Sequence, residues 1–200
     1  MTNTNSAKSP ARECPEAILA FWFGGDEKRG KRRAAWFKKD AAFDDEIRSR
    51  FLVTYELAAS GQLAHWQSLA HTCLALIVVL DQFPRNMFRG SPRAFAADAL
   101  ARETALYALK HGFDTAMKPV ERQFIYLPLE HGEALGYQLQ CLALMQSLSE
   151  FPETSDLHVW AEKHLLLIER FGRFPHRNAA LGRESTLEEI EFLKLAGSGF

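Results

Sequence analysis

Residues 73–80 constrain the fold most, because all eight of them are apolar (CLALIVVL). A helix with this sequence is apolar on every side and has to lie in the centre of a domain. A β-strand is the competing interpretation, since a short apolar run fits both. We favour the helix because no second strand with turn signals is available to pair with it, and Pro84 supplies a natural end. The sequence therefore predicts a buried central helix that is followed directly by Asp81, Gln82 and Arg85.

Further helices are predicted from apolar residues at helical spacing and from their start signals. Those starts are Pro15, Asp40, the Ser91-Pro92 pair, Pro119, a stripe from Leu135, a segment from Ser155, and the capping box at 185–189. Pro128 is expected to break the helix that begins at Pro119. These signals predict an all-α protein of seven or eight helices, with a flexible tail at 1–13 and a single domain at 14–200.

Composition excludes several classes of protein. The chain has 200 residues, 47% hydrophobic and 24% charged, with a formal net charge of −1, which is ordinary for a globular domain and does not favour nucleic acid as a partner. Its longest apolar run is far shorter than the roughly 20 residues of a membrane span. The three cysteines are an odd number without a CxxC pair, which indicates reduced thiols and a cytoplasmic protein.

A first group of candidate site residues follows the central helix: Asp81, Arg85, Asn86 and Arg89. A carboxylate at the end of an apolar helix has to be paired or protonated, because an unpaired buried charge costs several kcal/mol. Arg85 is the nearest candidate partner. The alternatives are a purely structural ion-pair network, or an arginine left available to bind a carboxylate or phosphate with both of its donors.

A second group lies in residues 129–133, where His131 and Glu133 are candidate catalytic residues together with Asp81. A histidine beside carboxylates can act as a general base near neutral pH. The bland alternative is that acidic residues in a first turn complement the helix dipole. No HExxH, GxGxxG, GxxxxGK[ST] or GxSxG motif occurs, so we predict neither a metal nor a cofactor.

The third group lies between two glycines, at 172–182, and contributes Arg173, His176, Arg177 and Asn178 as candidate ligand-binding residues. This segment repeats an earlier one, since FPRN at 83–86 recurs as FPHRN at 174–178. Loops of this kind carry function more often than helices do. The alternative is a packed connector whose arginines neutralise acidic groups in the core.

Three segments of the chain carry a resemblance to a known family: LALIVVLDQFPRNMFRG, YLPLEH with the following Glu133, and RFGRFPHRNAALGRES. The chain resembles the bacterial family known as domain of unknown function 924 over about residues 15 to 195. The resemblance implies antiparallel helix pairs stacked as in the tetratricopeptide-like helical superfamily, and it implies no reaction. Gly132 stands where the family usually has a serine, which counts against any scheme with a serine nucleophile between His131 and Glu133.

The sequence thus predicts a polar cleft for a small anionic molecule. Arg85, Arg173 or Arg177 would bind the anion, and His131, Glu133 or Asp81 would transfer a proton. The alternative is an interaction module, in which stacked helices bind a protein or peptide and the polar cluster only braces the scaffold. A metal-dependent enzyme and a purely structural role are the remaining possibilities.

Overall fold

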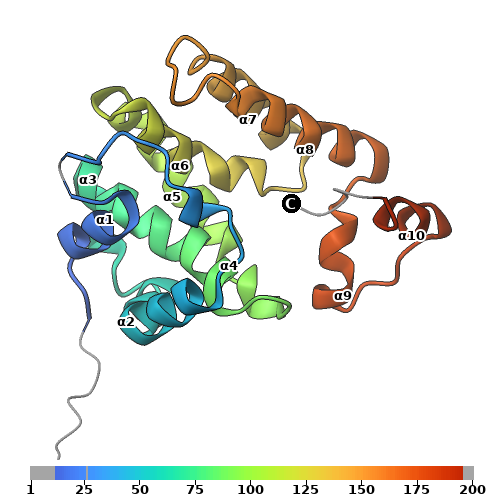
Figure 1. The fold of residues 1–200 in the computed structure, drawn as a ribbon, viewed down its shortest axis with the longest axis horizontal. Helices are drawn as coiled ribbons and strands as arrows, with labels where there is room; N and C mark the ends of the chain where they lie inside the picture. The colour runs from blue at the N-terminus through green and yellow to red at the C-terminus, as the bar shows by residue number, and fades with distance from the viewer. Residues whose placement is uncertain (1–11, 26, 196–200) are drawn as a thin grey trace, which may run out of the picture.

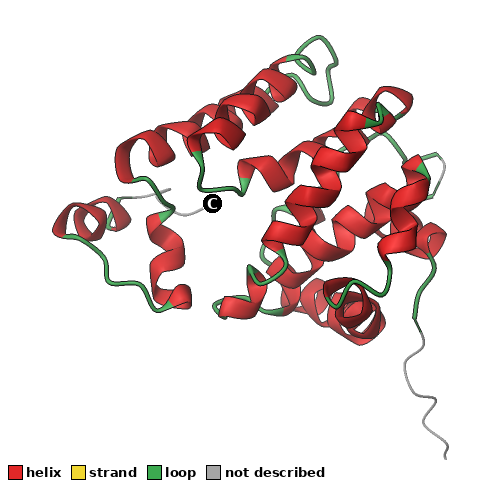
Figure 2. Ribbon diagram, turned by 180° about the vertical axis from the view of Figure 1, so that it is seen from behind, coloured by secondary structure: helices red, strands yellow, loops and turns green. Residues whose placement is uncertain are grey.

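The structure, a computed structural model, describes residues 12–25 and 27–195, which form helices and loops but no strand (Figures 1 and 2). The all-α class predicted from the sequence is confirmed. The helices are α1 (Pro15–Phe23), α2 (Ala41–Ala59), α3 (Ala70–Ile77), α4 (Phe83–Met87), α5 (Asp98–Lys110), α6 (Pro119–Glu130), α7 (Leu135–Gln146), α8 (Leu157–Phe171), α9 (Asn178–Leu181) and α10 (Leu187–Leu193).

The central helix does not end at Pro84, so that prediction is wrong. A π-helical turn, Val78–Gln82, joins α3 to α4 without a break, and the Phe83 N–H donates to the carbonyl of Val78, five residues back. The wider turn just before the proline relieves the clash that its ring would make with a preceding carbonyl. As a result Asp81 lies inside the π turn, fully buried, instead of after a helix end.

Two other predicted boundaries also differ from the structure. Pro128 lies inside α6, which continues to Glu130, so the expected break is absent. Because proline lacks an N–H, one carbonyl of the preceding turn has no helical donor. The last turn of α6 is buried, and its packing outweighs the loss of this hydrogen bond. The helix expected from Ser91-Pro92 is only a 3₁₀ turn, Pro92–Ala94, and α5 begins later, at Asp98.

The core is built around aromatic side chains from α1, α2, α4 and α6. The Phe83 ring is fully buried, with its centroid 4.6 Å from that of Phe51 and 5.6 Å from that of Trp22. Phe124 lies 4.8 Å from Trp36, which precedes α2. Edge and tilted contacts of this kind stabilise beyond the apolar area that they bury. The core therefore fixes α4, and with it Arg85, against helices from the first half of the chain.

Successive helices from α5 to α8 pack against one another in chain order, and α7 and α8 lie side by side along one edge of the molecule (Figure 1). The short helices α9 and α10 lie at the end opposite α1. A second small cluster, Leu167, Ile168 and Phe174 with Phe171 and Phe192, holds this end to α8. Gly172 and Gly182 both adopt the left-handed conformation that glycine favours, which lets the chain turn sharply at each end of the 172–182 segment. Membership of the tetratricopeptide-like superfamily stays a prediction.

Most of the predicted N-terminal tail lies outside the described residues. At its end, the backbone N–H of Glu13 donates to Oγ1 of Thr54 at 2.9 Å, and its carboxylate lies 3.3 Å from the guanidinium of Arg50. Within the described ranges, no helix is both long and apolar enough to cross a membrane.

We predict that Phe83→Ala lowers the free energy of unfolding by about 3–5 kcal/mol, because it empties a fully buried aromatic site. The matched control is Leu187→Ala on α10, where the side chain is 83% exposed and a change within about 0.5 kcal/mol is expected. Urea denaturation followed by circular dichroism measures both. Equal effects of the two substitutions would contradict the described core.

Candidate functional site

The candidate site is a cleft of about 700 Å³ between α4, α6 and α8, closed on further sides by the segments before α2 and α9. Within the described part of the chain, its lining contains five cationic side chains: Arg32, Lys39, Arg85, Arg89 and Arg177. It also contains three imidazoles, His131, His164 and His176. A cleft of this volume suits a small molecule.

Asp81 lies directly behind the cleft lining and organises two of the lining residues. Its Oδ1 is 2.7 Å from Nδ1 of His131 and 3.2 Å from Nη1 of Arg85, and its Oδ2 accepts from Nε2 of Gln82 at 2.5 Å. Burial opposes ionisation of this carboxyl, but Arg85 and His131 outweigh that effect and lower the pKa of Asp81 to about 2. Asp81 is therefore a carboxylate at neutral pH.

The ionised carboxylate fixes the tautomer of His131. Burial and the neighbouring Arg85 lower the pKa of His131 below its ordinary value, so the ring is neutral at pH 7. Nδ1 carries the proton, because a carboxylate can only accept. Nε2 then holds a lone pair, and it makes no hydrogen bond to any described residue. This arrangement prepares His131 to accept a proton from a molecule in the cleft.

Asp98, at the start of α5, joins the two copies of the repeated Phe-Pro segment. Arg85 from the first copy donates to both oxygens of Asp98, at 2.8 and 3.0 Å. Arg177 from the second copy lies 3.3 Å from the same carboxylate, and its Nη1 also donates to the carbonyl of His131 at 3.0 Å. Segments that are about ninety residues apart in the chain thus converge on one carboxylate beside His131.

The guanidinium of Arg177 is held between two aromatic rings. Its Cζ lies 4.8 Å from the centroid of Phe95 and 4.6 Å from that of Phe174. Burial and the nearby Arg85 lower the pKa of Arg177 to about 10, so it remains a cation at neutral pH. Its Nε is buried and makes no hydrogen bond within the described residues. The rings therefore fix the plane of the cation and direct its terminal nitrogens.

Glu130, next to His131 in the chain, has an environment opposite to that of Asp81. No arginine or lysine pairs with it among the residues that the structure describes; its oxygens lie 3.4 Å from Nδ1 of His164 and 3.9 Å from Sγ of Cys141. Burial and the charge of Asp81 raise the pKa of Glu130 to about 8. Burial also lowers the pKa of His164 to about 3, so this contact joins a protonated carboxyl to a neutral imidazole.

The structure brings most of the predicted site residues together. Six of them line the cleft: Arg85, Asn86, Arg89, His131, His176 and Arg177. Asp81 lies directly behind this lining. Burial and Arg177 lower the pKa of His176 to about 4, so this imidazole is neutral. Two of the six are braced from outside the cleft, since Asn86 and Arg89 both donate to Asp44 of α2, at 2.7 and 2.5 Å.

Three further predicted residues, besides Asp81, do not line the cleft, and each has structural partners. Glu133 accepts from Arg183 at 2.8 and 2.9 Å and from the backbone N–H of Phe174 at 3.0 Å. Arg173 donates to both oxygens of Glu189, at 2.6 and 2.8 Å, and Asn178 donates to the same carboxylate at 3.3 Å. These contacts connect the C-terminal segment to the loop after α6 and to α10. For Arg173 the packed-connector alternative describes the observed contacts. The helix-dipole alternative for Glu133 is wrong, because α7 begins only at Leu135 and Glu133 pairs with Arg183 instead.

Several residues of this region are not among the site residues predicted from the sequence. In the sequence, Asp98 has no feature that distinguishes it from any acidic residue in the first turn of a helix. Glu130 follows a run of buried residues in α6, and His164 lies on the buried face of α8. A polar residue on a face that otherwise packs into the core is the signal that could have identified these two residues. Gln123 also lines the cleft, and its buried Oε1 makes no hydrogen bond within the described ranges.

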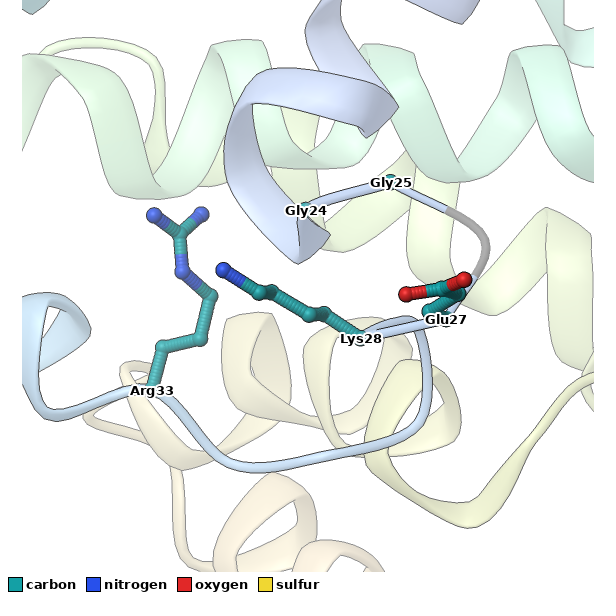
Figure 3. Close-up of a pocket in the computed structure, with 5 residues that line it drawn as sticks. All are labelled: Gly24, Gly25, Glu27, Lys28 and Arg33. Atoms are coloured by element: carbon teal, nitrogen blue, oxygen red, sulfur yellow. The ribbon is translucent and has the colours of Figure 1, made fainter.

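No group of three or more His, Cys, Asp and Glu side chains with metal-binding geometry occurs among the described residues. A second, smaller hollow of about 390 Å³ lies beside the C-terminal end of α1 (Figure 3). Its Arg33 donates to the carbonyls of Phe21 and Trp22, at 2.6 Å for the latter. This cation complements the carbonyl end of the helix, which explains its position without a ligand.

The fold and the cleft together define an all-α protein with a buried carboxylate–histidine pair at a cationic cleft. The chain belongs to the family described as bacterial protein of unknown function (DUF924), whose sequence model matches residues 18–197, as the resemblance in the sequence indicated. A solved structure of a protein of unknown function, ATU0120 from Agrobacterium tumefaciens, is similar, with a TM-score of 0.79 and 42% identity over 90% of this chain and 96% of that one. No curated protein matches the chain significantly.

We predict that Glu130→Gln changes how stability depends on pH. A carboxyl whose pKa is raised in the folded state, here from 4.5 to about 8, contributes stability that is complete below the ordinary pKa and is lost as the pH rises toward 8. Relative to wild type, the variant should therefore gain about 1.4 kcal/mol for each pH unit between about pH 5 and 7.5. Histidine contributions are common to both proteins and cancel in the difference.

Urea denaturation at several pH values measures this difference. Glu133→Gln is the matched control. Burial opposes ionisation of Glu133, but Arg183 and the Phe174 N–H outweigh burial and lower the pKa of Glu133. The contribution of Glu133 to the free energy of unfolding is therefore constant between about pH 5 and 7.5. Parallel stability curves for wild type and Glu130→Gln would show that Glu130 is ionised in the folded protein.

Proposed function

We propose that the cleft binds a small anionic molecule and that His131 transfers a proton to or from it. The charge of the lining carries this proposal. Five cationic side chains line the cleft, whereas Glu130 is its only carboxyl within the described residues and stays protonated below about pH 8. Asp81 and Asp98 pair with the arginines without lining the cleft themselves. An anion that enters the cleft would therefore meet donors on several sides.

Arg177 has the geometry of an anion-binding group. Its two ring contacts hold the guanidinium in one plane, and its Nη2 makes no hydrogen bond to any part of the chain that the structure describes. Lys39, also in the lining, forms no ion pair within the described ranges. A planar guanidinium suits the two oxygens of a carboxylate or phosphate, and a lysine near the opening adds attraction at longer range.

The Asp81–His131 pair supplies the reactive group. A carboxylate that holds Nδ1–H of an imidazole orients the ring and stabilises the imidazolium that forms when Nε2 accepts a proton. The lining contains no serine, threonine or cysteine among the described residues, which supports a proton transfer or an attack by water over a covalent intermediate on the chain. We infer a general base in His131, with Asp81 as the residue that positions it.

We also propose a cytoplasmic location. Cys14, Cys73 and Cys141 are free thiols, and burial raises the pKa of Cys73 to about 12. Unpaired cysteines fit a reducing compartment.

A thermal-shift titration with inorganic phosphate and with propionate tests the anion site. At 100 times its dissociation constant a ligand stabilises the folded protein by about 2.7 kcal/mol, and Arg177→Ala should weaken binding at least about tenfold. Arg170→Ala is the matched control, because Arg170 also lies over an aromatic ring, Phe171 at 4.8 Å, and pairs with an acid, Glu188 at 2.8 Å, away from the cleft.

Arg177→Lys keeps the charge if the alanine variant is too unstable, and it should bind more weakly than wild type because a lysine offers no planar pair of donors. If both anions stabilise the two alanine variants as much as wild type, the binding site lies elsewhere and the proposal fails.

The tautomer of His131 is a second prediction. At pH 7 the nitrogen NMR spectrum should show a neutral ring protonated on Nδ1, and Asp81→Asn should change that signal because the carboxylate acceptor is lost. His111 is the control, since its Nδ1 lies 2.8 Å from the carbonyl of Tyr107 and its ring does not line the cleft. A positively charged His131 ring at pH 7 in wild type would rule out its role as a base.

A second candidate function, an interaction module for a protein or peptide, is favoured by one observation. On α10, Leu187, Ile190 and Leu193 follow helical spacing and are 83%, 41% and 36% exposed. Such a stripe is typical of a contact surface. Self-association in sedimentation experiments that Leu187→Glu abolishes would support this candidate, and a chain that stays monomeric at all concentrations would count against it.

A further inference from the structure

The cleft lining is chemically divided between its interior and its mouth. The side chains of Arg85, His131 and Arg177 are only 18%, 14% and 7% exposed. In contrast, Phe37 is 60% exposed and Trp160 is 45% exposed, although both line the same cleft. Arg85, His131 and Arg177 thus lie at depth, and the opening presents the two aromatic surfaces together with the exposed cations Arg32, Lys39 and Arg89.

Buried apolar side chains continue the wall from these two aromatics. They are Trp36, Leu127, Met145 and Leu157, all of which line the cleft. A single exposed hydrophobic residue is common on protein surfaces and requires no explanation. Two exposed aromatics that adjoin a buried apolar wall inside one concave site are a different case, because together they form a surface that a ligand can cover.

Helix α8 gives the scale of the site. Leu157, Trp160 and His164 all line the cleft and are spaced by three and four residues, as residues on one helix face are. The helical rise places Trp160 about 6 Å along the axis from His164, and Leu157 about 10 Å from it. His164 lies against Glu130, the chain neighbour of His131, at 3.4 Å. One small molecule can therefore reach from the mouth to the proton-transferring group.

An ion pair links the segments that carry Phe37 and Trp160. Arg32, five residues before Phe37, pairs with Asp156, four residues before Trp160, at 2.6 Å. Lys163 lies 4.1 Å from the Trp160 ring centroid and covers one side of that ring. Phe37 and Trp160 are thus positioned parts of the cleft, suited to contact with another flat ring.

We propose that the ligand is an anion that carries an aromatic body, with its charged group at Arg177 and Arg85 and its ring against Trp160 and Phe37. This inference rests on the proposed anion site and adds the chemical class of the molecule. Trp160 lies one helical turn from His164, and the Phe174 ring contacts both His164, at 5.6 Å, and Arg177, at 4.6 Å, so a carboxylate separated from a ring by a short chain fits this span. Its polar end would then lie within reach of Nε2 of His131.

Three probes separate the two parts of this claim: propionate has the charge only, 3-phenylpropan-1-ol has the ring only, and 3-phenylpropionate has both. NMR titration of wild type should give about tenfold or tighter binding for 3-phenylpropionate than for either of the others, because part of a phenyl ring becomes buried. The indole N–H signals of Trp36 and Trp160 should shift, whereas those of the buried Trp22 and Trp66, which do not line the cleft, should not.

Trp160→Ala should lower the affinity for 3-phenylpropionate to that for propionate and leave propionate binding unchanged. Leu166→Ala is the matched control on the same helix, because Leu166 is 55% exposed and lies outside the lining. Phe37→Ala provides a second test from the other segment. Thermal melting confirms that each variant is folded, as is expected from the exposure of the residues that are replaced.

The outcomes distinguish this inference from the proposed function. If propionate and 3-phenylpropionate bind wild type equally well, the ligand needs no aromatic ring. The same conclusion follows if Trp160→Ala and Phe37→Ala both bind 3-phenylpropionate as tightly as wild type does. Either result would overturn this inference and leave the proposed anion site intact. Equal affinities for the alcohol and the acid, or no binding of either acid, would overturn the anion site itself.

Discussion

The fully buried carboxylate of Asp81 is the constraint on which the site depends. An ionised group at that depth requires partners, and the protein supplies them from three places in the chain: Gln82 beside it, Arg85 one turn later, and His131 at the end of α6. The same contacts that make the charge tolerable also orient His131 and hold Arg85 at the cleft. The stability of the centre and the chemistry of the cleft therefore have one origin.

Asp98 extends this network to the C-terminal part of the chain. By accepting from both Arg85 and Arg177, it brings the two copies of the Phe-Pro segment together beside His131. The second copy is also held by the rings on Arg177 and by the contacts of Glu133 with Arg183 and the backbone. The turn before α9, which carries His176 and Arg177, thus forms part of the cleft wall, and folding of that end completes the site.

Neighbouring groups in the cleft are kept in opposite protonation states by their surroundings. Asp81, with a guanidinium and an imidazole beside it, is ionised, and Glu130, with a thiol and a neutral imidazole beside it, is protonated. Pairs of groups whose environments separate their pKa values are typical of sites that transfer protons. A neutral base, a protonated acid and a set of cations then surround one cavity that has two aromatic side chains at its mouth.

The sequence by itself determined the helical class, the central position of residues 73–80, and the identity of half of the polar residues that line the cleft, because hydrophobic periodicity and a charge next to an apolar run are local signals. It did not separate Glu133, Arg173 and Asn178, which brace the scaffold, from His131 and Arg177, because both groups consist of the same residue types in the same segments. It also missed Asp98 and Glu130. Only the tertiary structure decided those assignments, since the partner of a buried charge comes from a distant part of the chain and the packing of helices determines which side chains meet.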